Sequence, residues 1–210
     1  MARTAGSSGA KTVEAITKAA LALFAQRGYA AVSMRAIAQE VGIQVGALYN
    51  HFATKQDVLA RVMVGHMKEL LSAWDQAREG ANTPVEKLEA FVRFHVRYHM
   101  TRHDGVFTSF MELRSLEPEN YAQLEALRKR YEYDVRDILE EGAKSGDFQI
   151  TDPHVSAMIL LSMLMGVTNC FKQGGRLNKD EVEEIYLAMA FRAVCCEEVK
   201  TQRLERTRDV

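Results

Sequence analysis

The stretch SMRAIAQEVGIQVGALYNHF, residues 33–52, decides the fold of this 210-residue chain. Ser33 is a typical helix N-cap, and the apolar spacing after it predicts a short helix that runs to Val41 and stops at Gly42. A second short helix is expected over residues 44–51. Two short helices joined by a glycine turn have the layout of a helix-turn-helix, and they need a third helix to bury their apolar sides.

That third helix is expected from Lys11 to Arg27, where apolar residues recur on one face. Once Val45, Leu48 and Phe52 point inward, the opposite face of the second short helix is fixed. This outward face consists of Gln44, Gly46, Ala47, Asn50 and His51. It has no long charged side chain, so it can enter the major groove of DNA deeply.

The chemistry of these residues predicts their contacts with DNA. The amide of Gln44 can pair with adenine, and the methyl group of Ala47 can touch that of thymine. The side chains expected around phosphates are Ser33, Arg35, Tyr49, His51 and Lys55. A three-helix packing unit that binds no DNA is the alternative explanation of the same pattern.

Charge is distributed unevenly along the chain. The net charge is −1, but residues 1–55 carry +4 and the remainder carries −5. A positive head on an acidic body suits a polyanionic partner at one end only.

Three segments resemble the DNA-binding domain of TetR-family regulators: AALALFAQRGY at 19–29, SMRAIAQEVGIQVGALYNHF at 33–52 and TKQDVL at 54–59. The resemblance runs from Ile16 to Leu59. It implies backbone contacts from Ser33, Tyr49, His51 and Lys55, and base contacts from Gln44, Gly46 and Ala47. Gln44 departs from the pattern, because serine often stands there; this weakens the local cap and alters the expected base preference.

The whole chain is expected to be all-α, with no convincing strand pair. The expected organisation is a flexible arm at 1–10, a helix-turn-helix domain at 11–57 and a helical ligand-binding and dimerisation domain at 58–205. Further helices are predicted at 54–79, 84–102, 105–116, from 118 to between 142 and 146, 153–173 and 178–200. The family resemblance implies this architecture more than it implies a ligand.

The last two predicted helices are the expected dimer surface, because both are rich in apolar residues. Those residues are Ile159, Leu160, Met163 and Leu164 on one, and Ile185, Leu187, Met189 and Phe191 on the other. A homodimer also suits a palindromic operator in double-stranded DNA. The alternative is an internal core without a dimer.

A small-molecule pocket is expected among the helices from Pro84 to Gly146 and the inner face of the helix at 153–173, where aromatic residues and methionines are dense. The candidate ligand contacts are Phe91, Phe94, His95, Tyr98, His99, Phe107, Phe110, Met111, Arg114, Tyr131, Met158 and Asn169. Plain core packing explains the same spacing. FMELRSL followed by YEYDVRDILEEGAKSGDF resembles TetR-like regulators that respond to fatty acyl or other acyl-CoA thioesters, so a hydrophobic effector of that class, or a fatty acid, is expected to release the repressor from its operator.

Histidines at 95, 99 and 103 line one helix face, and two of them could share a metal ion with Glu112. We expect no metal and no cofactor, because three residues in a row spaced four apart span about 12 Å and cannot ligate one ion. A metal sensor that uses only two of these histidines remains an alternative. A regulator that activates, or one that has no ligand, is another.

An all-helical enzyme is a third alternative, but no nucleophile elbow, phosphate loop or HExxH motif is present, so no catalytic residues are expected. The three cysteines, an odd number that includes an adjacent pair, suit a reducing cytoplasm. The first residues lack the apolar run of a secretory signal. The uncharged run 155–171 is expected to be a buried helix rather than a membrane span.

Overall fold

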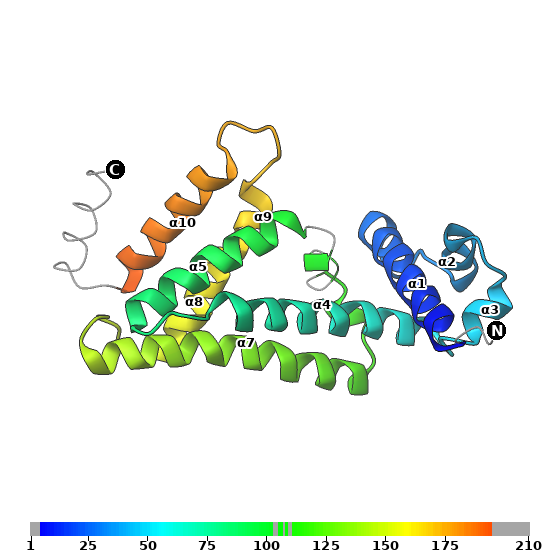
Figure 1. Ribbon diagram of the computed structural model, residues 1–210, viewed down its shortest axis with the longest axis horizontal. Helices are drawn as coiled ribbons and strands as arrows, with labels where there is room; N and C mark the ends of the chain where they lie inside the picture. The colour runs from blue at the N-terminus through cyan, green and yellow to red at the C-terminus, as the bar shows by residue number, and fades with distance from the viewer. Residues whose placement is uncertain (1–4, 103–104, 107, 109–110, 195–210) are drawn as a thin grey trace. The chain divides into compact units, whose positions relative to one another are not determined.

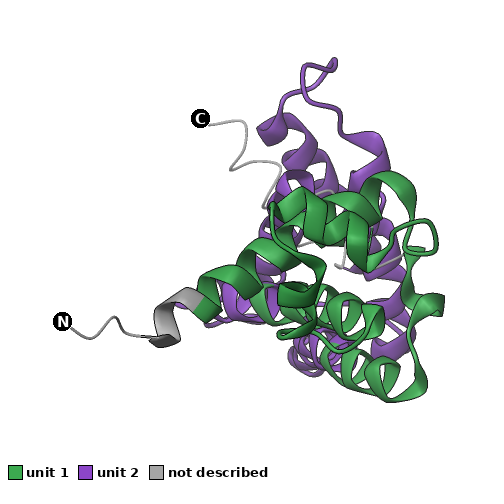
Figure 2. Ribbon diagram, turned by 90° about the vertical axis from the view of Figure 1, so that its right-hand side faces the viewer, with its two compact units in different colours: residues 1–69, 103–127 green, residues 70–102, 128–210 purple. Residues whose placement is uncertain are grey.

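The computed structural model describes residues 5–102, 105–106, 108 and 111–194, and they contain helices and no strand (Figure 1). The described residues divide into two compact units, coloured in Figure 2. Unit 1 comprises residues 1–69 and 103–127, and unit 2 comprises residues 70–102 and 128–210. The all-α prediction is therefore confirmed for the described part of the chain.

Unit 1 contains the predicted three-helix arrangement. Helix α1 spans Ala5–Arg27, α2 spans Met34–Val41 and α3 spans Val45–Tyr49. α2 packs against both α1 and α3. α1 begins earlier than expected, so residues 5–10 extend a helix instead of forming an arm. Adding a residue to an existing helix gains one hydrogen bond without a new nucleation cost, which offsets the low propensity of this glycine- and serine-rich start.

The ends of α2 follow from local chemistry. The hydroxyl of Ser33 accepts a hydrogen bond from the backbone N–H of Ala36 at 3.1 Å. Gly42 ends the helix in the left-handed region, with φ of 76°, where a Cβ would be strained. Gln44 precedes α3 and makes no side-chain cap bond, as expected from its departure from serine.

α4, Lys55–Ala77, contributes residues to both units, as does α7, Pro118–Ser145. A reciprocal pair of hydrogen bonds between Thr54 and Asp57 caps the start of α4. Between α5 and α7 lies the short 3-10 helix η1, Leu113–Ser115, within the segment that was expected to be a helix through Leu116. Of this segment, Phe107 and Phe110 lie outside the described residues.

Unit 2 is built around α5, Pro84–Thr101, which packs against α8, α9 and α10. Thr83 and Glu86 form the predicted capping box at its start. α10 spans Lys179–Val194. Its predicted extension beyond Val194 falls outside the described residues.

The long apolar helix expected at 153–173 is interrupted. α8 spans Pro153–Met165, and α9 spans Val167–Cys170 after a break at Gly166. By length and composition alone, the segment Pro153–Cys170 could cross a membrane, with a mean hydropathy of 1.3. Core and interface helices meet the same criterion. Only 22% of this segment is buried in the single chain, which contradicts the expectation of a buried helix.

Candidate functional site

The outward face of α3 is displayed as predicted. Leu48 is fully buried and Phe52 nearly so, and they hold the helix against the core of unit 1. Val45 is half-buried. On the other side, Gln44, Gly46, Asn50 and His51 are exposed, Ala47 is half-buried, and Tyr49 is 51% exposed. The helix thus presents small and uncharged groups to solvent while one leucine anchors it.

Some of the residues predicted around phosphates already have partners within the chain, although the Ser33 hydroxyl and the Lys55 ammonium each keep a hydrogen-bond donor. Ser33 and Arg35 are exposed, but the hydroxyl of Ser33 is already the cap of α2. The ammonium of Lys55 donates to the carbonyls of Tyr29 and Val32, at 2.9 Å each, and lies 4.1 Å from the centre of the Tyr29 ring. Lys55 therefore fastens the turn after α1 to the start of α4.

A polar network inside unit 1 involves residues that sequence reasoning did not connect. The backbone N–H of Tyr29 donates to Glu112 at 2.9 Å, and the hydroxyl of Ser115 donates to the same carboxylate at 2.7 Å. The side-chain amide of Gln56 donates to the Tyr29 hydroxyl at 3.1 Å. The side-chain carbonyl oxygen of Gln56 accepts a hydrogen bond from the backbone N–H of Glu117, also at 3.1 Å.

This network joins the turn after α1 and the start of α4 to the segment around η1. Glu112, weighed above as a metal ligand, is occupied here as a hydrogen-bond acceptor. Gln56 had no distinguishing sequence signal, because its partners in that segment are about sixty residues away in the chain. Burial raises the pKa of Tyr29, so its hydroxyl stays protonated in this network.

In unit 2, six of the predicted ligand contacts form one aromatic cluster. They are Phe91, Phe94, His95, Tyr98 and His99 from α5 and Tyr131 from α7. Trp74 of α4 joins them, with its ring 5.0 Å from that of Phe91. The sequence signal for Trp74 was available, since it is the only tryptophan of the chain and lies in an amphipathic helix.

The two histidines of the aromatic cluster stack, with ring centres 3.9 Å apart. Burial, followed by the neighbouring His99, lowers the pKa of His95 well below its ordinary value. Burial also lowers the pKa of His99 to about 4, against the opposing effect of its hydrogen bond to the His95 carbonyl. Both rings are therefore neutral near pH 7. His103 lies outside the described residues, among which no group of three metal-ligating side chains occurs.

The aromatic cluster contains two buried nitrogen atoms without a hydrogen-bond partner among the described residues, Nε1 of Trp74 and Nε2 of His95. Burial raises the pKa of Tyr131 well above its usual value, so its hydroxyl is protonated and can donate to Nδ1 of His95, 3.1 Å away. That assignment leaves the ring proton of His95 on Nε2. Two N–H donors are then buried with no acceptor among the described residues, and each unmade hydrogen bond of this kind costs about 1–3 kcal/mol.

The remaining predicted ligand contacts lie elsewhere. Met111 and Arg114 are exposed residues of unit 1, and Met158 and Asn169 are exposed residues of unit 2. Met158 belongs to an apolar stripe on α8 and α10, whose members are Val155, Met158, Ile159, Ile185 and Met189, each between 48% and 62% exposed. Of the expected dimer residues, Leu160, Leu164, Leu187 and Phe191 are instead buried within the chain. The spacing of apolar residues along each helix predicted which faces are apolar. It could not predict which apolar face is buried within the chain and which is exposed.

Comparison with known proteins places both parts of the chain. Residues 16–62 match the family model for bacterial regulatory proteins of the tetR family. Residues 81–194 match the model for the tetracyclin repressor-like C-terminal domain. The repressor KstR2 of Mycolicibacterium smegmatis is 27% identical over 194 residues, which cover 90% of this chain and 93% of the relative.

Two solved structures extend the similarity. The TetR-family regulator PfmR of Thermus thermophilus is 33% identical, with a TM-score of 0.75 over 84% of this chain and 97% of that one. AibR, solved in complex with isovaleryl coenzyme A and operator DNA, is 26% identical, with a TM-score of 0.80 over 85% of this chain and 97% of that one.

Proposed function

Because the chain belongs to the TetR family of bacterial regulatory proteins, we propose that it represses transcription in the cytoplasm as a homodimer, and that a hydrophobic acyl-CoA or fatty acid releases it from a palindromic operator. Family membership supports the assignment as a DNA-binding transcriptional regulator. The observation that carries the proposal is the exposed, uncharged face of α3 on a packed three-helix support.

Base reading is assigned to Gln44, Gly46, Ala47 and Asn50. The first can make a bidentate contact with adenine, and the small residues beside it let the helix backbone approach the bases. Arg35, Tyr49 and His51 are exposed around this face and are assigned to phosphates. Each good base contact of this kind discriminates against a wrong base by about 1–3 kcal/mol.

The dimer is assigned to the apolar stripe of α8 and α10. Its five large side chains are each about half exposed in the single chain, although α8 has almost no polar face. Such a surface is stabilised by burial against an identical copy, and a twofold interface also matches a twofold DNA site.

The effector is assigned to the aromatic cluster of unit 2. An apolar interior with few polar groups suits a hydrophobic ligand, and the N–H groups of Trp74 and His95 offer hydrogen bonds to an acceptor such as a carbonyl oxygen. The similarity to AibR, which was solved with isovaleryl coenzyme A, supports an acyl thioester.

Release follows from two conformations with different affinity for DNA. Both α4 and α7 run from unit 2 into unit 1, so a ligand that prefers one arrangement of these helices can bias the spacing of the two α3 helices in the dimer. A coupling free energy of about 1–3 kcal/mol weakens DNA binding roughly 5- to 150-fold.

The test is titration of DNA from the protein's own upstream region, with and without decanoyl-CoA, isovaleryl-CoA and decanoate. We expect nanomolar-range binding that weakens steeply with salt and is reversed by at least one acyl compound. Ala47→Glu should abolish binding, whereas Glu79→Gln, in the exposed loop after α4, should not. A monomer without affinity for this DNA at low salt would refute the proposal.

A further inference from the structure

A solvent-facing groove of about 560 Å³ lies between α4 and α5 in unit 2. Three features line it: small residues, aromatic rings and arginines. The lining residues are Ala73, Ala77, Ala90, Arg93, Phe94, Arg97, Tyr98, Thr101 and Arg102. The volume lies within the range of small-molecule sites, and the lining combines an apolar strip with positive charge.

The apolar strip of the groove consists of alanines and two aromatic rings. Ala73 and Ala77 lie one turn apart on α4, and Ala90 faces the groove from α5. The rings of Phe94 and Tyr98 lie 5.4 Å apart and also belong to the aromatic cluster. The groove therefore shares two rings with the cluster assigned to the effector, and the small alanine side chains leave room for an extended alkyl chain.

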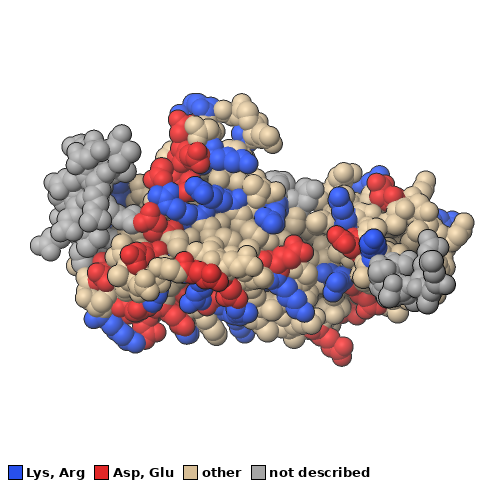
Figure 3. Space-filling model, viewed as in Figure 1, with Lys and Arg blue, Asp and Glu red and all other residues tan. Residues whose placement is uncertain are grey.

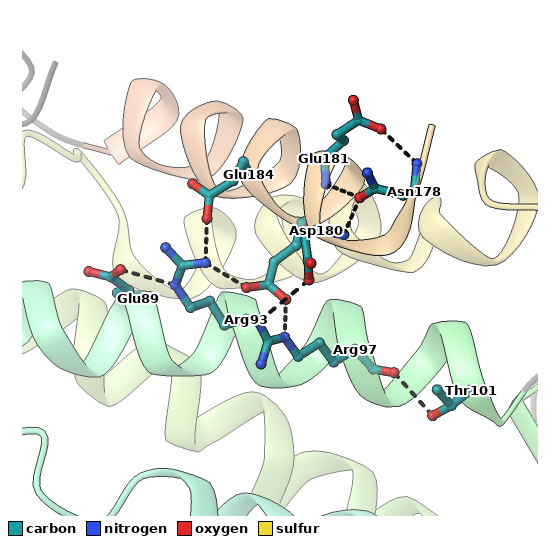
Figure 4. A network of polar contacts seen from close by, with 9 residues as sticks. Glu89, Arg93, Arg97, Thr101, Asn178, Asp180, Glu181 and Glu184 are labelled. Carbon is teal, nitrogen blue, oxygen red and sulfur yellow. Dashed lines mark hydrogen bonds and ion pairs between the residues drawn. The ribbon is translucent and has the colours of Figure 1, made fainter. Parts of the chain in front are cut away.

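Two of the three arginines are held by carboxylates (Figure 4). Arg93 binds Glu89 at 3.0 Å, Glu183 at 2.5 Å and Glu184 at 2.6 Å. Burial alone would lower the pKa of Arg93, but these hydrogen bonds outweigh it and raise the pKa.

Arg97 also binds Glu183, which is 1% exposed on α10. Figure 3 shows basic and acidic groups interleaved on the surface of this part of unit 2. These two arginines thus serve to fasten α10 to α5, and their charge is compensated.

The third arginine, Arg102, is not compensated in this way. Its guanidinium lies 4.2 Å from the centre of the Tyr98 ring, and no ion pair to it occurs among the described residues. Arg102 is exposed and directly follows α5, where the helix dipole favours a positive charge. This interaction leaves the N–H donors of the guanidinium available for hydrogen bonds. An arginine stacked on a ring at the mouth of an apolar groove can bind an anion with its outward edge.

We propose that this groove binds an amphipathic anion, with the carboxylate or phosphate group on Arg102 and the alkyl chain along the alanine strip toward Phe94. The inference rests on the proposed function, because this anion is taken to be the effector itself. It adds a location and a charge requirement: a neutral molecule with the same chain binds much more weakly.

The single tryptophan provides the measurement, since Trp74 lies between two groove alanines in sequence and 5.6 Å from the ring of Phe94. Its fluorescence in the full-length protein is titrated with decanoate, decanoyl-CoA, decanol and coenzyme A alone. We expect one or both decanoyl anions to bind at least tenfold more tightly than decanol. Binding of decanoate identifies the carboxylate as the headgroup, and binding of decanoyl-CoA alone identifies the phosphates.

Two variants and one control test the location. Arg102→Gln should weaken anion binding about 10- to 100-fold, the range expected for a hydrogen bond to a charged group. Ala77→Leu, at an exposed position, should block the groove without removing charge. Arg136→Gln, which removes a half-buried arginine paired with Asp137 on α7, should bind as the wild type does.

The outcomes separate this inference from the proposed function. If acyl compounds release DNA but Arg102→Gln and Ala77→Leu respond like the wild type, the groove assignment is wrong while the repressor proposal stands. If the anions bind in an Arg102-dependent way but never release DNA, the groove stands and effector control fails. Equal binding of decanol and both anions, or binding of none of them, overturns the inference.

Discussion

The backbone N–H of Tyr29 donates a 2.9 Å hydrogen bond to the carboxylate of Glu112, which is 83 residues further along the chain. This contact brings the turn that follows α1 to the segment between α5 and α7, within unit 1. The helix-turn-helix is therefore not a self-contained module of the first sixty residues, because residues after α5 help to hold its backbone.

Replacing Glu112 with alanine should lower the free energy of unfolding by about 1–3 kcal/mol. The substitution leaves the N–H of Tyr29 and the hydroxyl of Ser115 without their acceptor in a part-buried place. Urea denaturation measures the loss. Glu117→Ala is the control, since only the backbone N–H of that residue joins the network; equal losses in the two variants would argue against a specific role for the carboxylate.

Replacing Gln44 with serine should stabilise α3 and change the DNA sequence that is bound. Gln44 makes no side-chain cap bond, whereas a serine hydroxyl at this position can accept from the first turn of the helix. We expect a gain of about 0.5–1 kcal/mol in denaturation, typical of a helix cap, and a shift in the preferred base opposite this residue in a binding-site selection. An unchanged base preference would show that residue 44 does not read bases.

The protein should lose stability as the pH falls from about 6.5 toward 4. The folded-state pKa of His99 is about 4, and that of His95 is also lowered, so the unfolded chain takes up protons that the folded chain does not. The free energy of unfolding keeps its full value above the pKa that these histidines have in the unfolded chain. Below that pKa it decreases by about 1 kcal/mol per pH unit for each histidine. His99→Gln should flatten this slope, and an identical slope would contradict the assignment.

Replacing Glu183 with glutamine should destabilise the protein far more than replacing Glu184. Glu183 is buried and binds both Arg93 and Arg97, whereas Glu184 is exposed and binds only Arg93. Removing the buried charge weakens hydrogen bonds to two arginines, which costs about 1.5–3 kcal/mol, while an exposed pair is worth about 1 kcal/mol or less. Thermal unfolding of the matched variants decides between these values.

Introducing a charge at Ile159 should convert the proposed dimer into monomers. Ile159 is 62% exposed at the middle of α8, so Ile159→Lys costs little in the single chain but places two like charges near each other in a twofold interface. Sedimentation velocity should show the change in mass, with weaker operator binding. Ser72→Lys, at an exposed position on α4, is the control.

Local structure could be predicted from the sequence where the chemistry is local. The cap at Ser33, the stop at Gly42 and the capping box at Thr83 each depend on residues within four positions of one another. The buried side of α3 also followed from the spacing of its apolar residues.

Long-range arrangement could not be predicted in the same way. Glu112 was weighed as a metal ligand because its true partner, Tyr29, is distant in sequence. Met158 was placed inside because burial in a core and burial against a partner select the same apolar residues, so periodicity cannot separate them. A role for the groove arginines could not be predicted, since their spacing on and just after α5 resembles that of any solvated helix face.

The separation of a buried anchor from an exposed face within α3 has an evolutionary consequence. Leu48 alone is buried in that helix, so the amino acids at its outward positions are almost unconstrained by folding. Duplicated genes of this kind can diverge toward new promoters through a few surface substitutions while the scaffold and its inducer remain as they were.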